Sequence, residues 1–153
     1  MPHEHTIDKE VAAASIFRSP RAQGRPGTVE TLEMILDYEL RSALRYRRFA
    51  SLVLISHSPD RELMQVLDGN LRACDQVFEI NSNVAVLMAE TDKAGALIAI
   101  GRIREVSKGL LDVRFAIASF PEDARGTAEL LWAAHRRLDK AQDQEVGTAV
   151  TVG

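Results

Sequence analysis

Apolar residues recur at helical spacing near both ends of the region that we expect to fold. One stripe predicts an amphipathic helix over residues 28–48, because residues three and four apart share a face of an α-helix. Its members are Leu32, Ile35, Leu36, Leu40, Ala43 and Leu44. A second stripe predicts a helix that begins at Thr127, a residue type that caps helix N-termini. Its inner face consists of Leu131, Ala134, Leu138 and Ala141.

The chain between these two helices alternates between strand and helix patterns. Short apolar runs predict strands over residues 49–55, 76–80 and 84–88, and an alternating pattern predicts a fourth strand over residues 113–118. The polar triplet Asn81-Ser82-Asn83 predicts a tight hairpin turn, and helical spacing predicts helices over residues 60–74 and 92–108. The order is therefore helix, then β-α-β-β-α-β-α. It predicts an α+β fold with a ferredoxin-like, antiparallel-containing sheet and helices on one face.

The composition suits one domain with a tail at each end. Residues 18–27 hold two prolines, two glycines and three arginines without helix or strand periodicity, so residues 1–28 are predicted to be a flexible tail or linker. The folded domain is expected over residues 29–142. Residues 143–153 are expected to be a loose C-terminal tail.

Charge, cysteine content and hydropathy exclude several functional classes. A formal net charge of −3 gives no field that would recruit nucleic acid. No apolar run approaches the roughly 18–20 residues of a membrane span, and the polar N-terminus lacks the apolar core of a signal peptide. The single cysteine, Cys74, excludes a disulfide within one chain. We therefore expect a cytoplasmic protein without nucleic-acid binding or direct membrane insertion.

The region 29–142 resembles the GGDEF domain family, the bacterial diguanylate cyclases. Residues 38–55 are similar to that family's first helix running into its first strand, and residues 75–91 to the hairpin that carries its Gly-Gly-Asp/Glu-Glu-Phe motif. Residues 113–142 are similar to its last strand, Phe-Pro-Glu-Asp loop and last helix. The resemblance implies a nucleotide-cyclase-like fold and a role in bacterial cyclic di-GMP signalling.

The positions that carry the family's chemistry hold other residues here. Ser56 and Ser58 stand where the family has Asp-x-Asp, and Asn81, Ser82 and Asn83 replace the glycines and acids of the hairpin motif. Mg²⁺ prefers carboxylate oxygens, which these residues do not supply. Between Ser58 and Asp75 only 16 residues remain, where the family has a guanine-binding segment of about two helices. The resemblance therefore implies a degenerate domain without catalytic residues, bound metal or cofactor.

One polar motif of the family is retained. Arg72 and Asp75 have the Arg-x-x-Asp spacing of the inhibitory site at which the family binds its product, cyclic di-GMP. An arginine pairs bidentately with phosphate or with the Hoogsteen edge of guanine, and an aspartate accepts from guanine N–H groups. The alternative is that Asp75 only caps the turn into the next strand.

The last predicted helix carries a candidate interface. Trp132 lies about 100° from the inner face, next to His135 and Arg136. Either Trp132 packs under the edge of the sheet, or it is exposed and marks a surface for a protein partner. The leading hypothesis is a non-catalytic regulatory or protein-interaction module, the alternative is a cyclic di-GMP receptor, and an active diguanylate cyclase is the least favoured.

Overall fold

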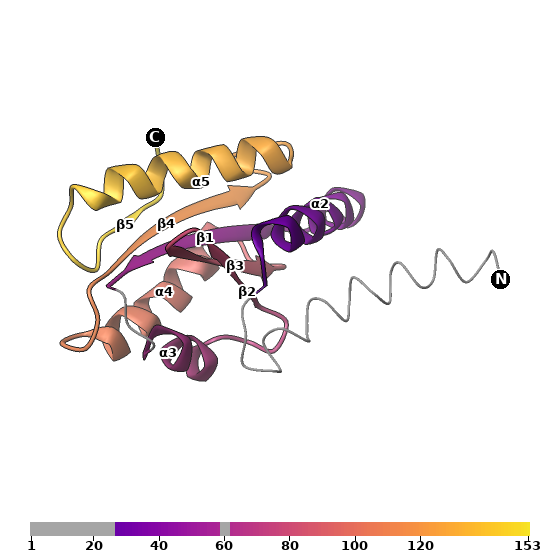
Figure 1. Cartoon of the computed structure of the whole chain (residues 1–153). Coiled ribbons are helices and arrows are strands. Elements are labelled where there is room, and N and C mark those ends of the chain that lie inside the picture. The colour runs from indigo at the N-terminus through magenta and orange to yellow at the C-terminus, as the bar shows by residue number, and fades with distance from the viewer. Residues whose placement is uncertain (1–26, 59–61) are drawn as a thin grey trace.

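The computed structural model describes residues 27–58 and 62–153, which form four helices and one five-stranded sheet (Figure 1). In chain order the elements are α2 (Val29–Tyr46), β1 (Ala50–His57), α3 (Glu62–Asn70), β2 (Gln76–Ile80), β3 (Asn83–Ala89), α4 (Lys93–Ser107), β4 (Val113–Phe120), α5 (Thr127–Gln142) and β5 (Ala149–Val150).

The sheet has the strand order β2-β3-β1-β4-β5. The four longer strands pair in antiparallel fashion, and β5 adds to β4 in parallel. The predicted order of elements and the α+β class with an antiparallel-containing sheet are therefore confirmed.

The expectation of helices on one face of the sheet is wrong. Helices α2 and α5 lie on one face, and α3 and α4 on the other (Figure 1). Along β1, Leu52 and Leu54 pack with the first pair of helices, whereas Val53 and Ile55 pack with the second pair. A strand that is covered on both faces is apolar at nearly every position. This explains why the sequence of β1 is a continuous run of apolar residues.

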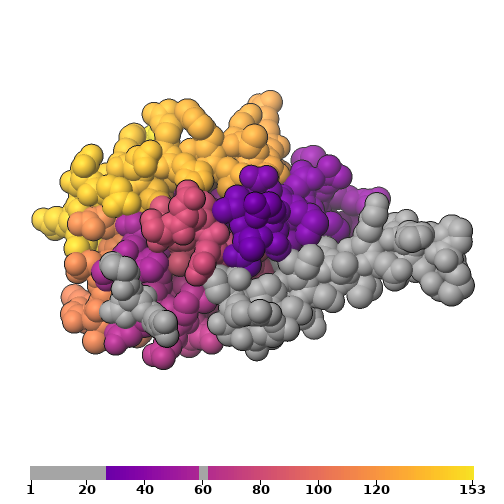
Figure 2. All heavy atoms as spheres, viewed as in Figure 1, coloured from indigo at the N-terminus to yellow at the C-terminus, as the bar shows by residue number. Residues whose placement is uncertain are grey.

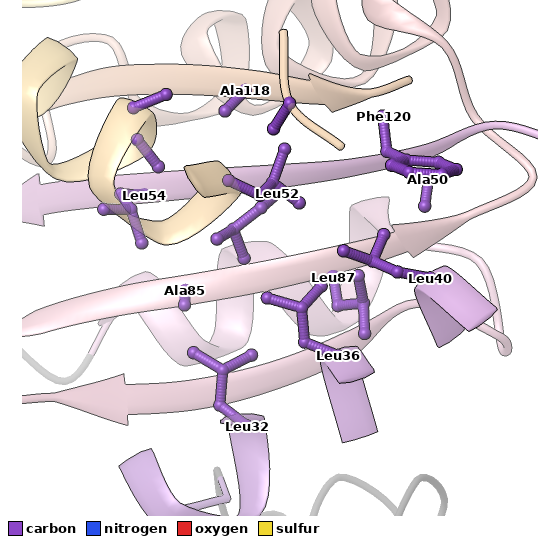
Figure 3. Packing of buried hydrophobic residues seen from close by; sticks show 14 of the residues in the cluster. Leu32, Leu36, Leu40, Ala50, Leu52, Leu54, Ala85, Leu87, Ala118 and Phe120 are labelled. Carbon is purple, nitrogen blue, oxygen red and sulfur yellow. The ribbon is translucent and has the colours of Figure 1, made fainter. Parts of the chain in front are cut away.

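Helix α2 begins after Thr28, whose side chain accepts a hydrogen bond from the N–H of Thr31. Leu32, Leu36 and Leu40 project from it onto the strands (Figure 3). Leu44 does not continue the predicted stripe, because 69% of it is exposed. Four residues advance a helix by 400°, so each member is rotated by 40° and the fourth leucine lies about 120° from the first.

Helix α5 adjoins α2 on the surface of the molecule, where Figure 2 shows the two helices in orange-yellow and indigo. Its N-cap is Gly126, so the prediction that Thr127 caps the helix is wrong; Thr127 instead donates a hydrogen bond to Asp37 of α2. The buried face includes Leu130 and Arg137, and Leu131 is only partly buried.

Short segments near the two ends of the described chain cover part of the free edges of β2 and β4. Gly27 forms a parallel bridge with Phe78 of β2, accepting a hydrogen bond from the N–H of Glu79. At the opposite edge, the N–H of Phe115 in β4 donates to the carbonyl of Thr148, and β5 follows. Residues 143–153 were expected to be a loose tail. Ala149 and Val150 instead form a short strand, because the edge of β4 offers backbone groups that would otherwise be unpaired. The rest of the predicted N-terminal tail lies outside the described residues.

Candidate functional site

The positions that depart from the family motif meet at one end of the sheet. Ile55 of β1 is the last residue paired with β3, opposite Val84, and Asn83 pairs with Ile80 across a two-residue turn. The residues that follow Ile55, including Ser56 and Ser58, therefore lie at the same end of the sheet as the turn Asn81-Ser82. The structure brings together the two segments that the sequence analysis linked.

The positions at this end of the sheet that depart from the family motif hold serine and asparagine, whose side chains carry no charge. The hydroxyl of Ser56 donates to the side-chain carbonyl of Gln142 at 3.4 Å, and His57 Nδ1 lies 2.6 Å from the carbonyl oxygen of Ser58. Serine hydroxyls and asparagine amides do not supply the charged oxygens that Mg²⁺ prefers, so the residues present do not fit the metal that the resemblance would bring. Within residues 27–58 and 62–153, no three histidine, cysteine or acidic side chains are grouped to hold a metal ion.

Arg72 and Asp75 form a closed pair just before β2. The buried carboxylate of Asp75 accepts from the backbone N–H of Arg72 at 2.8 Å and from Arg72 Nη2 at 3.0 Å. This geometry agrees with the alternative that Asp75 caps its own turn. The hydrogen bond that Arg72 donates to Asp75 also raises the pKa of Arg72, so the guanidinium stays charged.

Two further contacts fix the direction of the Arg72 side chain. Its Nη2 donates to the carbonyl of Ala89 at 2.8 Å and to the hydroxyl of Thr91 at 2.5 Å. Both acceptors lie at the end of β3, next to the start of α4. The guanidinium is therefore held across the turn that joins these two elements.

A hollow of about 380 Å³ opens beside this guanidinium. Arg72 and Asp75 line it from the turn before β2, Thr91 from the segment after β3, and Ile98 and Arg102 from α4. Arg102 was missed in the sequence analysis, which followed only the apolar stripe of this helix. A usable signal was the spacing of Gly95, Ile98, Ala99 and Arg102, which lie on one face of α4 and all line the hollow.

The carboxylates that line this first hollow are already engaged by the protein. Glu90 forms an ion pair with Arg48, and Asp92 caps α4 by accepting from the N–H of Gly95. Asp75 is held by Arg72. The two arginines are the cationic side chains of this lining, and a guanidinium is a group that can pair with phosphate oxygens.

A second hollow of about 390 Å³ adjoins the first and shares Phe49 and Asp92 with it. It is lined in addition by Lys93 and Leu97 from the start of α4, and by Glu122 from the loop before α5.

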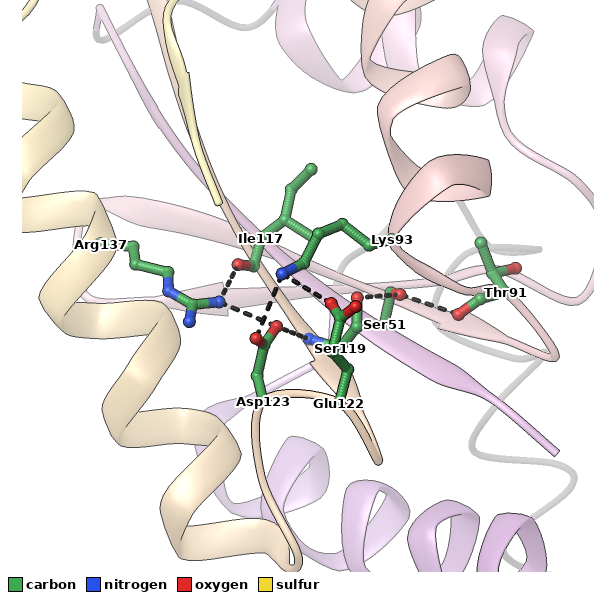
Figure 4. A network of polar contacts seen from close by, with 8 residues as sticks. All are labelled: Ser51, Thr91, Lys93, Ile117, Ser119, Glu122, Asp123 and Arg137. Carbon is green, nitrogen blue, oxygen red and sulfur yellow. Dashed lines mark hydrogen bonds and ion pairs between the residues drawn. The ribbon is translucent and has the colours of Figure 1, made fainter. Parts of the chain in front are cut away.

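Three residues that line this second hollow, Lys93, Ser119 and Glu122, belong to a polar network centred on Asp123 (Figure 4). Asp123 accepts from Arg137 at 2.9 Å, from the N–H of Ser119 at 2.8 Å and from Lys93 at 3.1 Å. Lys93 also forms an ion pair with Glu122 at 2.7 Å. The network connects α4, the loop before α5 and α5 itself, and so fixes the groups that face the hollow.

Trp132 is exposed, so the interpretation that it packs under the edge of the sheet is wrong. Its exposed fraction is 61%, and the guanidinium carbon of Arg136 lies 4.7 Å from the ring centroid. His135 is also exposed on α5. The three predicted interface residues therefore lie on the outer side of this helix.

The chain has the GGDEF-domain, nucleotide-cyclase-like fold. The GGDEF domain of TpbB (YfiN) from Pseudomonas aeruginosa superposes with a TM-score of 0.77 at 21% identity, covering 84% of this chain and 91% of that one. A microbial GGDEF domain that interacts with cyclic di-GMP has a TM-score of 0.73 at 13% identity, covering 92% of this chain and 99% of that one. These identities are low, so they show a shared fold.

A third solved structure contains a protein partner. It is the diguanylate cyclase SiaD from Pseudomonas aeruginosa in complex with its activator SiaC, with a TM-score of 0.73 at 13% identity, covering 99% of this chain and 68% of that one. No model of a known protein family matches the sequence. No curated protein matches it either. Among the described helices, none is long and apolar enough to cross a membrane.

Proposed function

We propose that this chain is a non-catalytic regulatory domain in cyclic di-GMP signalling, and that it binds cyclic di-GMP in the hollow lined by Arg72 and Arg102. The observation that carries the proposal is the convergence of these two arginines, from separate elements, on one hollow beside a buried carboxylate.

The non-catalytic part rests on the residues at the end of β1 and in the hairpin turn. Phosphoryl transfer depends on metal ions that neutralise charge on the phosphates. Ser56 and Ser58 carry no charge, and neither do the asparagines of the turn. A domain with this end of the sheet has no group to hold Mg²⁺ against a nucleoside triphosphate.

The binding part rests on the chemistry of the first hollow. A guanidinium fork pairs with phosphate oxygens or with O6 and N7 of guanine. Arg72 is pre-oriented by its bonds to Asp75 and Thr91, which reduces the entropy lost when a ligand binds. Asp75 acts here as the residue that positions Arg72, since both of its oxygens already accept from that residue.

Isothermal titration calorimetry of the full chain with cyclic di-GMP tests the binding part. We expect micromolar or tighter affinity, weakened at least about tenfold in Arg72→Ala and in Arg102→Ala, since charge-assisted hydrogen bonds are worth about 1.5–3 kcal/mol. Arg41→Ala is the matched control, because Arg41 is exposed on α2, which lies on the other face of the sheet. No heat at about 100 µM ligand would overturn the proposal.

Incubation with GTP and Mg²⁺ tests the non-catalytic part separately. We expect no formation of cyclic di-GMP by the wild-type chain, measured by chromatography of the products. Turnover that is lost on substitution of Ser56 or Asn83 would contradict this part of the proposal and leave the binding part standing.

A second candidate function, docking of a protein partner, is favoured by the exposed Trp132 and its stacked Arg136. Exposed tryptophan is costly, and tryptophan and arginine are enriched where interfaces concentrate their binding energy. We expect Trp132→Ala to abolish capture of a partner from cells that express the full chain, while Trp132→Phe retains part of it. Equal capture by the wild type and Trp132→Ala would remove this candidate.

A further inference from the structure

We propose that cyclic di-GMP straddles Phe49, with one guanine in the hollow of Arg72 and Arg102 and the second guanine in the adjoining hollow that Glu122 lines. This inference rests on the proposed function and adds a second base-binding subsite to it. It names Phe49 and Glu122 as residues that determine specificity for a ligand with two bases.

The two hollows have one aromatic side chain in common. Phe49 lines both of them, and 49% of it is exposed although it directly precedes the buried strand β1. The hollows are also close in size, at about 380 and 390 Å³. A ligand built from two identical halves matches a pair of similar hollows that share one wall.

Helix α4 supplies an apolar residue to each side of Phe49. Leu97 lines the second hollow and its neighbour Ile98 lines the first. Both side chains are exposed, as is Phe49, so an apolar surface is left uncovered between two groups of charged residues. Flat bases that stack on such a surface remove it from water, and stacking on an aromatic ring tolerates any base.

The polar groups of the second hollow distinguish guanine from adenine. Glu122 has an exposed carboxylate that is held in place by its ion pair with Lys93, and Lys93 is itself fixed by Asp123. A carboxylate accepts from the N1–H and the amino group of guanine, whereas adenine has no N–H at N1. The first hollow supplies arginines and the second supplies a carboxylate, so the two guanines are recognised differently.

Calorimetry with cyclic di-GMP and with GMP separates the subsites. We expect Phe49→Leu to weaken cyclic di-GMP binding about tenfold through loss of stacking, and Phe49→Tyr to stay near the wild type. Glu122→Gln should weaken cyclic di-GMP binding several-fold and leave GMP binding unchanged, because a single base occupies the arginine hollow. Arg102→Ala should weaken both ligands.

Methyl NMR of the wild-type chain gives a second measurement that needs no substitution. Cyclic di-GMP should shift the methyl signals of both Leu97 and Ile98, and GMP should shift only those of Ile98. One set of results would overturn the straddling arrangement and leave the proposed function standing. In that case Arg102→Ala loses cyclic di-GMP binding, Phe49→Leu and Glu122→Gln bind it like the wild type, and the Leu97 methyl signals stay unshifted. If the wild type binds no cyclic di-GMP, both are overturned.

Discussion

The surroundings of Asp123 shift the pKa of its carboxyl group in opposite directions. Burial acts to raise its pKa, but hydrogen bonds from Arg137, the N–H of Ser119 and Lys93 outweigh burial and hold the pKa below its ordinary value of 3.8. The charged form is therefore the one that the folded chain stabilises (Figure 4).

This pKa shift predicts a loss of stability in acid. The pKa of Asp123 is lower in the folded chain than in the unfolded chain. Ionised Asp123 therefore stabilises the fold fully at a pH above its unfolded-state pKa, and this stabilisation is lost as the pH falls through its folded-state pKa. We expect Asp123→Asn to lower the free energy of unfolding at pH 7 by about 2–4 kcal/mol, since Arg137 is then buried without its carboxylate. Urea denaturation at pH 7 and pH 3 measures the effect.

Glu122→Gln is the matched control for Asp123→Asn, because Glu122 lies next to it and its side chain is 63% exposed. The ion pair of an exposed carboxylate contributes little, so the change should stay within about 1 kcal/mol. The prediction fails if Asp123→Asn unfolds at the same urea concentration as the wild type at pH 7.

Glu39 shows the opposite shift and so the opposite prediction. Its partial burial raises the pKa, the nearby charge of Glu90 raises it further, and Arg48 opposes them. Ionised Glu39 therefore lowers the free energy of unfolding at a pH above its folded-state pKa. This effect disappears when Glu39 is protonated. We expect Glu39→Gln to stabilise the chain by about 0.5 kcal/mol at pH 7 and by less at low pH, measured by thermal unfolding. Glu33→Gln, on the exposed side of α2, serves as the control.

At the scale of elements, α2 and α5 begin in different ways. The side chain of Thr28 accepts a hydrogen bond from the N–H of Thr31 and so caps α2, whereas α5 starts after Gly126, which has no side chain to cap it. Both helices cover the same face of the sheet.

The two threonines therefore predict unequal effects of the same substitution. We expect Thr28→Ala to lower the free energy of unfolding by about 1 kcal/mol, the usual cost of a lost N-cap. Thr127→Ala should cost within about 0.5 kcal/mol, because its hydroxyl donates to the side chain of Asp37 and caps no backbone N–H of a helix. Chemical denaturation of both variants measures the difference, and equal losses would show that the cap of α2 contributes nothing specific.

Periodicity in the sequence was sufficient to predict the order of the elements but not their arrangement in space. The positions of the four longer strands followed from their apolar runs, whereas β5 was not predicted. Val53 and Leu54 pack on opposite faces of the sheet, and an unbroken apolar run does not indicate which residue lies on which face. The turn that ends at Asp75 followed from a local motif. Arg102 and Phe49 did not, because their place beside Arg72 depends on how α4 and β1 lie against the turn.

For the whole molecule, binding and stability are linked. A ligand that binds only the folded chain raises the free energy of unfolding by about 2.7 kcal/mol when its concentration is 100 times the Kd. We expect cyclic di-GMP to raise the melting temperature of the wild type in this way, and to leave that of Arg102→Ala nearly unchanged. An equal rise in both proteins would place the ligand elsewhere than the arginine hollow.

The short bridge at Gly27 and the two-residue strand β5 have a consequence for how copies of this domain meet. An outer strand with free N–H and C=O groups is a template for pairing with another chain. Here Gly27 occupies part of the free side of β2, and a side chain at this position would collide with the ring of Phe78, since an added Cβ would lie 2.6 Å from it. With residues 147–150 covering part of the free side of β4, both ends of the sheet are partly covered, which shortens the edge open to pairing with another copy.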